Sequence, residues 1–174
     1  MHEKETEALL SALKENPKLM GISGQLRIDC AKEKLLESMR ESHFSGLYFG
    51  IESPNEQTLR KIGKPNTRTK IIKTLARAKM LGFDLAGAFT IGYPWETEAD
   101  ILNTLDFARN LKKEFELKPS VYIVTPFPNT PLSKLIPDNQ IKIRDYELWD
   151  AKHAIMDTDY LSRECIQELY DSFI

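Results

Sequence analysis

Cysteine is scarce in this chain, which has only Cys30 and Cys165 among 174 residues. The two lie far apart and form no metal-ligand motif, so the sequence assigns no metal ligand. Two cysteines this far apart also give no sign of a disulfide framework. We therefore expect two ordinary thiols in a protein of the reducing cytoplasm.

Long apolar runs and an excess of one charge are also missing. No stretch approaches the ~20 apolar residues that cross a bilayer, and the N-terminal sequence Met-His-Glu-Lys-Glu is not that of a signal peptide. The net charge is −2, with 24 basic and 26 acidic side chains and no long basic run. This balance gives no reason to expect nucleic acid or a membrane as a partner.

What the chain does have is a regular alternation of apolar runs and amphipathic stretches. Such alternation is typical of repeated βα units. Near-continuous apolar runs predict buried parallel strands at 19–28, 47–51, 85–91 and 121–124. Helices are predicted at 5–15 (ended by Asn16-Pro17), 32–43, 69–81, from Thr97 onward, and 162–173. A short helical turn within 53–66 and a short strand near 152–156 complete the prediction.

This pattern predicts an α/β fold, namely a partial TIM-like (β/α) barrel. About four parallel strands with flanking helices would form an arc of the barrel, followed by a C-terminal helical extension. We place the barrel portion at residues 1–136 and the extension at 137–174. A doubly wound open sheet is the competing architecture, but Gly21-Ile22-Ser23-Gly24 is a poor phosphate loop because it lies within the first strand.

Polar residues gather where the predicted strands end. Right-handed crossovers bring all strand C-termini to one rim, where such groups can converge on a ligand. Three of these residues also have a purely structural explanation. Arg27 could form an ion pair with Asp29 or Glu52, Glu96 could interact favourably with a helix dipole, and Gly92 could allow a turn. The candidates are Gln25, Arg27, Glu52, Ser53, Gly92, Glu96 and Thr125.

Three segments at these ends resemble one family in order and spacing. Residues 50–53 read Gly-Ile-Glu-Ser, residues 90–100 read Thr-Ile-Gly-Tyr-Pro-Trp-Glu-Thr-Glu-Ala-Asp, and residues 125–132 read Thr-Pro-Phe-Pro-Asn-Thr-Pro-Leu. They resemble the radical S-adenosylmethionine (SAM) superfamily, and within it the cobalamin-binding branch that includes anaerobic Mg-protoporphyrin monomethyl ester cyclase-like proteins. Residues 25–29 and 145–164 are similar to that branch too, so the resemblance covers nearly the whole chain.

The resemblance implies roles for ten residues around SAM. Glu52 and Ser53 would contact the ribose and the methionine part, while Gln25 and Arg27 would face the SAM carboxylate or the substrate. A flat base needs small residues and apolar walls around it. The residues implied on the adenine side are Ile91, Gly92, Glu96, Val124, Thr125 and Pro126.

One part of the family pattern is absent. The family binds a 4Fe–4S cluster through Cys-x₃-Cys-x₂-Cys after its first strand, and this loop and the Gly-Gly-Glu-like segment after the second strand are not in the sequence. The resemblance thus implies the C-terminal portion of a radical SAM oxidoreductase. The intact parent would cleave SAM to a 5′-deoxyadenosyl radical that attacks a small-molecule substrate, with cobalamin as a further cofactor. We expect the isolated chain to be inactive.

Two alternatives remain open at this point. One is a non-catalytic binding or assembly module built on a half-barrel. The other is a cluster-free (β/α) enzyme that uses Glu52 or Glu96 as a general base, which would need a raised pKa and a partner. In each case an arc of four strands leaves an open edge and an uncovered face, so we expect self-association.

Overall fold

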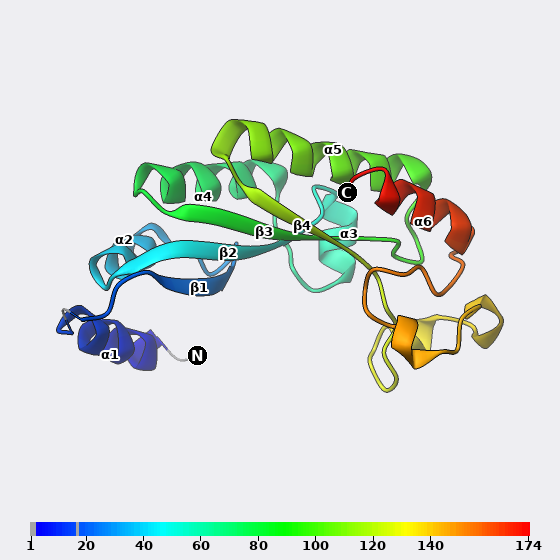
Figure 1. Cartoon of the computed structure of the whole chain (residues 1–174), viewed down its shortest axis with the longest axis horizontal. Coiled ribbons are helices and arrows are strands. Elements are labelled where there is room, and N and C mark those ends of the chain that lie inside the picture. The colour runs from blue at the N-terminus through cyan, green and yellow to red at the C-terminus, as the bar shows by residue number, and fades with distance from the viewer. Residues whose placement is uncertain (1–2, 17) are drawn as a thin grey trace.

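The computed structural model describes residues 3–16 and 18–174 and contains one parallel sheet in the order β1-β2-β3-β4 (Figure 1). Because the strand order never reverses, the sheet has no switch point of the doubly wound kind. The prediction of four parallel strands with flanking helices is confirmed. The strands are β1 (Ile22–Arg27), β2 (Phe44–Glu52), β3 (Asp84–Ile91) and β4 (Lys118–Ile123).

Helices precede β1, connect each pair of successive strands and follow β4, and they agree with the predicted ones to within a few residues. The capping box predicted at Thr97 is present, because its side chain accepts from Asp100 N–H while the Asp100 carboxylate accepts from Thr97 N–H. Pro17, predicted to end the first helix, lies outside the described residues. The helices are α1 (Glu3–Lys14), α2 (Glu33–Glu41), α3 (Glu56–Lys61), α4 (Arg68–Met80), α5 (Glu98–Phe115) and α6 (Arg163–Asp171).

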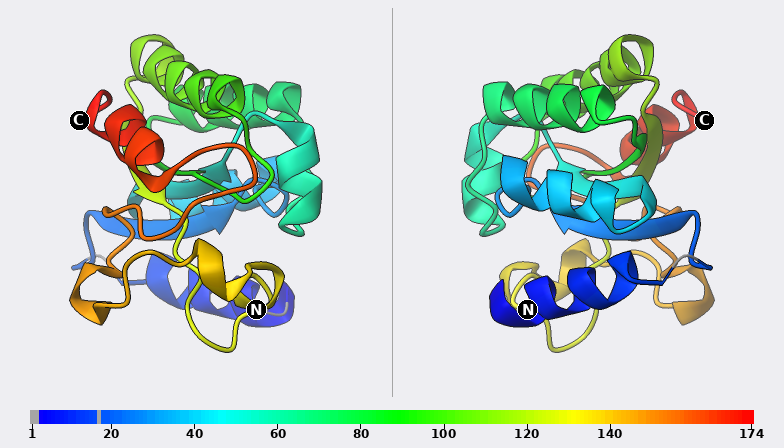
Figure 2. Two further views of the ribbon diagram at one scale, coloured as in Figure 1. Left: turned by 90° about the vertical axis from the view of Figure 1, so that its right-hand side faces the viewer. Right: turned by 90° about the vertical axis from the view of Figure 1, so that its left-hand side faces the viewer.

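The two faces of the sheet differ in burial. Residues of β2 and β3 alternate strictly at their C-terminal halves, so Phe49, Ile51 and Phe89 are fully covered on the helical side. Helices α4 and α5 run side by side over this face (Figures 1 and 2). The opposite face carries polar and small side chains, among them Gln25 and Tyr122, and remains accessible. In a closed barrel this second face would line the interior.

The C-terminal extension is mostly irregular. Between β4 and α6 the chain forms three short 3₁₀ turns at Ser133–Leu135, Asp138–Gln140 and Tyr146–Leu148. The strand predicted near 152–156 is wrong, since only one antiparallel bridge forms there, between Ile141 and Met156. Ala154 N–H instead donates to the Gln167 side chain, and the Ile155 carbonyl accepts from both Lys142 N–H and Ile143 N–H, so no regular ladder forms. Within residues 3–16 and 18–174, no helix is long and apolar enough to cross a membrane.

Candidate functional site

Glu52 ends β2 in an unusual backbone conformation. Its φ is 67°, in the left-handed region that non-glycine residues rarely adopt. The pairing with β3 shifts by one residue here, from Gly50 opposite Ala88 to Glu52 opposite Phe89. This bulge turns the carboxylate onto the open face, at a cost of about 1–2 kcal/mol for the left-handed residue.

The Glu52 carboxylate has two partners. One oxygen accepts from Lys64 Nζ, and the other accepts from Thr90 Oγ1 at 2.8 Å. Gly50 makes room for this arrangement, because a Cβ there would stand 3.0 Å from the carboxylate and 3.3 Å from Lys64 Nζ. The Glu52 side chain remains 13% exposed, so an edge of it can still be reached from the open face.

Arg27 and Gln25 lie on the neighbouring strand β1, on the same open face. The Arg27 guanidinium donates two hydrogen bonds to Asp29, at 2.9 and 2.8 Å, and this contact holds the pKa of Asp29 below its usual range. Of the two ion pairs considered for Arg27, the structure forms the one with Asp29. Strand pairing sets Arg27 beside Gly50, and the space that a Gly50 side chain would fill is taken by the Glu52 carboxylate and Lys64 Nζ.

Ser53 follows Glu52 but turns inward. It is fully buried, and its hydroxyl lies 3.1 Å from Thr104 Oγ1 on α5 and accepts from Asn55 N–H at 3.1 Å. Asn55 in turn caps α3, accepting from Gln57 N–H at 2.9 Å, and donates to Asp100 Oδ1 at 2.8 Å. The β2–α3 loop is thereby joined to the start of α5.

Glu96 is also fully buried and organises the loop between β3 and α5. One carboxylate oxygen accepts from Gly92 N–H at 3.0 Å and from Tyr93 N–H at 3.1 Å. Burial raises the pKa of Glu96 to about 7, although the two N–H donors oppose the rise. Gly92 has φ 83°, and a Cβ there would approach Ile166 to 3.2 Å. Its lack of a side chain is therefore needed both for the turn and for the packing of α6.

The remaining four candidates lie at the ends of β3 and β4. Ile91 is buried in the main core, and its carbonyl accepts from Val124 N–H at 2.9 Å, which holds the two strand ends together. Val124 belongs to a second hydrophobic cluster with Tyr93. Thr125 Oγ1 donates to Ile123 O at 3.4 Å, and Pro126 lines a hollow in the extension.

Three side chains of this rim were not among the residues chosen from the sequence. Thr90 and Tyr48 share the strand face of Glu52, a placement that two-residue periodicity could have indicated. The Tyr48 hydroxyl lies 3.3 Å from the Tyr122 hydroxyl across the open face, and burial, followed by this contact, raises the pKa of Tyr48 to about 12. Lys64 lies in a loop, where no pattern indicated it.

The residues present do not fit an iron–sulfur cluster. Such a cluster needs three thiolates close together, whereas Cys30 and Cys165 are single free thiols. Throughout residues 3–16 and 18–174, no group of three or more His, Cys, Asp or Glu side chains could hold a metal ion. Polar groups suited to a hydroxyl-rich or zwitterionic molecule are present at the rim. The chain therefore has residues suited to binding SAM but none suited to binding the cluster.

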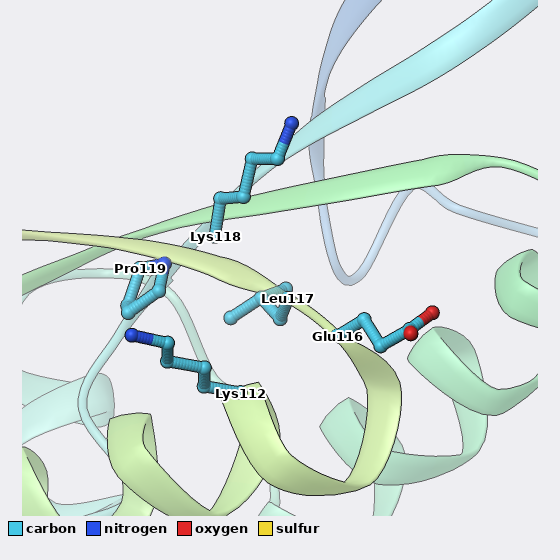
Figure 3. A pocket seen from close by; sticks show the side chains of 5 residues that line it. All are labelled: Lys112, Glu116, Leu117, Lys118 and Pro119. Carbon is cyan, nitrogen blue, oxygen red and sulfur yellow. The ribbon is translucent and has the colours of Figure 1, made fainter.

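A hollow of about 410 Å³ also occurs at the other end of β4. Lys112, Glu116, Leu117, Lys118 and Pro119 line it, and Figure 3 shows the Lys112 side chain reaching toward Pro119. These residues precede or begin β4, so they lie at the N-terminal ends of the strands. The hollow is therefore separate from the rim.

Comparison with known proteins finds a relative in sequence. The chain is 30% identical over 144 residues to an uncharacterised methyltransferase of Pyrococcus horikoshii, covering 82% of this chain and 31% of that protein. It therefore spans about a third of the length of this relative.

Solved structures agree at the level of the fold. Coproporphyrinogen III oxidase of Escherichia coli, a radical SAM enzyme, aligns with a TM-score of 0.69 at 18% identity, covering 99% of this chain and 37% of that one. The radical SAM methyltransferase TsrM of Kitasatospora setae, solved with cobalamin and a 4Fe–4S cluster, gives 0.62 at 12% identity, with coverage of 96% and 34%. The arc of a (β/α) barrel is thus confirmed.

The sequence profile of the radical SAM superfamily matches residues 1–108, which include β1, β2, β3 and the loop built around Glu96. The chain belongs to the radical SAM superfamily.

Proposed function

We propose that the rim of this sheet binds the SAM of a radical SAM enzyme whose cluster ligands lie outside these 174 residues. The observation that carries the proposal is the Glu52 carboxylate, which a left-handed residue and a bulge hold on the open face next to Arg27. Strain of this kind persists where the surrounding structure maintains it, and it is frequent at functional sites. When bound to a reduced cluster, SAM would supply a 5′-deoxyadenosyl radical.

The rim residues would divide this task between contact and positioning. Glu52 would accept from the ribose hydroxyls or the methionine ammonium, and Arg27 with Gln25 would face the methionine carboxylate or the substrate. Ile91, Gly92 and residues 124–126 would form the adenine side. Ser53 and Glu96 are fully buried and hydrogen-bonded within the protein, so their contribution would be to hold the two loops in place.

The proposed reaction class is radical chemistry on a small organic molecule in the cytoplasm. Hydrogen abstraction followed by oxidation is one outcome. Methyl transfer is the second candidate, because the Pyrococcus relative is named a methyltransferase and TsrM is a cobalamin-containing methyltransferase. Cobalamin would then be held by residues outside this chain.

S-adenosylhomocysteine provides a test of the rim that does not require a cluster. Calorimetry should detect its binding to the chain, and Glu52→Gln should weaken the affinity about tenfold, because a hydrogen bond to a charged group is worth about 1.5–3 kcal/mol. Glu56→Gln is the matched control, since Glu56 is an exposed α3 residue whose carboxylate pairs with Arg60. Equal affinities for the wild type and Glu52→Gln would contradict the assignment.

A second experiment tests the proposal that the isolated chain has no radical SAM activity. After anaerobic treatment with iron and sulfide, the isolated chain should cleave no SAM to 5′-deoxyadenosine. A full cluster with turnover would refute this part of the proposal. Binding of S-adenosylhomocysteine, together with no cleavage of SAM by any longer form of the protein, would favour the alternative, a non-catalytic binding module. The general-base alternative finds little support at Glu96, because its carboxylate is fully buried and faces loop N–H groups.

The open side of the sheet leads to a proposal about association. Within residues 3–16 and 18–174, strand β1 pairs with β2 alone, and its open-face residues Ser23, Gln25 and Arg27 are exposed. Unpaired strand edges favour pairing with another chain. We therefore propose that the isolated chain self-associates, and light scattering at micromolar concentration should give a mass above 20.0 kDa. A clean monomer at that concentration would oppose this proposal.

A further inference from the structure

The C-terminal extension borders a second, open hollow of about 440 Å³ beside the rim. This volume lies within the roughly 300–1,000 Å³ usual for small-molecule sites. Its floor is Ile136, which packs in one cluster with Tyr93 and Val124 from the ends of β3 and β4. Pro126, just beyond β4, forms part of the wall. The hollow is therefore continuous with the strand ends, although most of its lining comes from residues 133–149.

Aromatic rings form one wall of this hollow. The Trp149 indole N–H donates to Ile143 O at 3.1 Å, which fixes the ring, and the Tyr146 ring packs against it with centroids 4.9 Å apart. The Phe127 ring also lies near Trp149, with centroids 6.4 Å apart. Tyr146 is 69% exposed and Phe127 is 48% exposed, so neither ring is buried in the hydrophobic core. An immobilised indole with exposed neighbours offers a stacking surface for a planar ring.

Two charged side chains line the hollow, Arg144 and Asp138, and they form an ion pair. Arg144 Nη2 donates to Asp138 Oδ2 at 2.7 Å and more weakly to Asp138 O at 3.4 Å. Within the described part of the chain, no hydrogen bond is formed by Arg144 Nε or Nη1. Asp138 thus orients the guanidinium through one nitrogen and leaves its other edge for an incoming acceptor. A guanidinium edge matches the two oxygens of a carboxylate.

We propose that this hollow binds a planar unsaturated ring compound carrying a carboxylate. The ring lies against Trp149 and Tyr146, between the proline and isoleucine walls, and the carboxylate pairs with Arg144. The position of the hollow next to the strand ends makes this ligand class that of the substrate, and only this last step rests on the proposed function. Binding itself needs neither SAM nor a cluster.

The test compares two probes of the same shape, 2-naphthoate and naphthalene-2-methanol, by calorimetry on the whole chain. Arg144→Gln should weaken 2-naphthoate about tenfold, as expected for the loss of a charge-assisted contact, and should change the neutral alcohol less than about twofold. Trp149→Leu should weaken both probes about tenfold. Arg109→Gln is the control, because Arg109 lies on α5, where it pairs with Asp106.

The outcomes separate cleanly. Loss of both probes in Trp149→Leu counts only if its thermal transition matches the wild type, and Tyr146→Leu, at a more exposed ring, serves as the second variant. The inference would be overturned if 2-naphthoate did not bind, or if its affinity were unchanged by substitution of Arg144, Trp149 and Tyr146. The SAM proposal is tested separately, by S-adenosylhomocysteine binding to the wild type and to Glu52→Gln. Failure of that proposal would therefore leave the naphthoate result unaffected, and the two failures can be distinguished.

Discussion

Glu96→Ala is expected to lower the free energy of unfolding by about 2–6 kcal/mol, because two buried donors, Gly92 N–H and Tyr93 N–H, lose their acceptor and each unsatisfied donor costs about 1–3 kcal/mol. Urea unfolding at about pH 5, where the folded-state carboxyl is protonated, measures this without the cost of a buried charge. Glu98→Ala is the matched control, since Glu98 is exposed in the first turn of α5. A change below about 1 kcal/mol would mean that water replaces the carboxylate.

The same residue sets a pH dependence whose sign is fixed by its raised pKa. The folded-state pKa of Glu96 is about 7, above its ordinary 4.5, so the folded chain binds more protons than the unfolded chain between these values. Stability contributed by Glu96 is therefore greatest below pH 4.5 and decreases as the pH rises toward 7, by about 2–3 kcal/mol. Glu96→Gln keeps an oxygen acceptor for the two N–H groups and should remove this decrease. Parallel stability profiles of wild type and Glu96→Gln would contradict the assignment.

Phe89→Ala should have a comparable effect, lowering the free energy of unfolding by about 3–5 kcal/mol. Phe89 is fully buried in β3, between β2 and β4, and pairs in register with Glu52 and Val121. The helices above it are held by other contacts, so the vacated volume would collapse only in part. Chemical unfolding measures the loss.

Met80→Ala is the control for this core substitution. Met80 is 78% exposed at the end of α4, and its truncation should change the free energy of unfolding by less than about 0.5 kcal/mol. If the two substitutions cost the same, Phe89 does not belong to a well-packed core.

The strand positions were predictable because their apolar runs are nearly continuous, but β2 and β4 each begin three residues earlier than predicted, β2 at Phe44 instead of Leu47. The run 121–124 indicated the last strand, whereas β4 already begins at Lys118 and includes Pro119. Proline and lysine are poor strand formers. They are tolerated because β4 is an edge strand in this sheet, so the missing N–H of Pro119 removes no ladder bond on its outer side. That compensation depends on strand order, which local pattern does not contain.

The rim was predictable in its position and less so in its orientations. The sequence predicted that Glu52 and Ser53 lie at a strand end, and both do, but Glu52 is on the open face whereas Ser53 is buried. The burial of Ser53 depends on Thr104, which lies 51 residues along the chain on α5. The acceptor role of Glu96 depends on a loop fold that turns at Gly92. Such long-range packing leaves no local periodicity, whereas the face shared by Tyr48 and Thr90 does.

The bond from Asn55 to Asp100 has a consequence for motion. Asn55 caps α3, and Asp100 belongs to the capping box of α5, so one side chain fastens the beginnings of both helices to each other. Neither loop can shift toward a ligand without breaking this bond or carrying its neighbour along. We therefore expect the two loops to move together, so that displacement of either one is transmitted to the other.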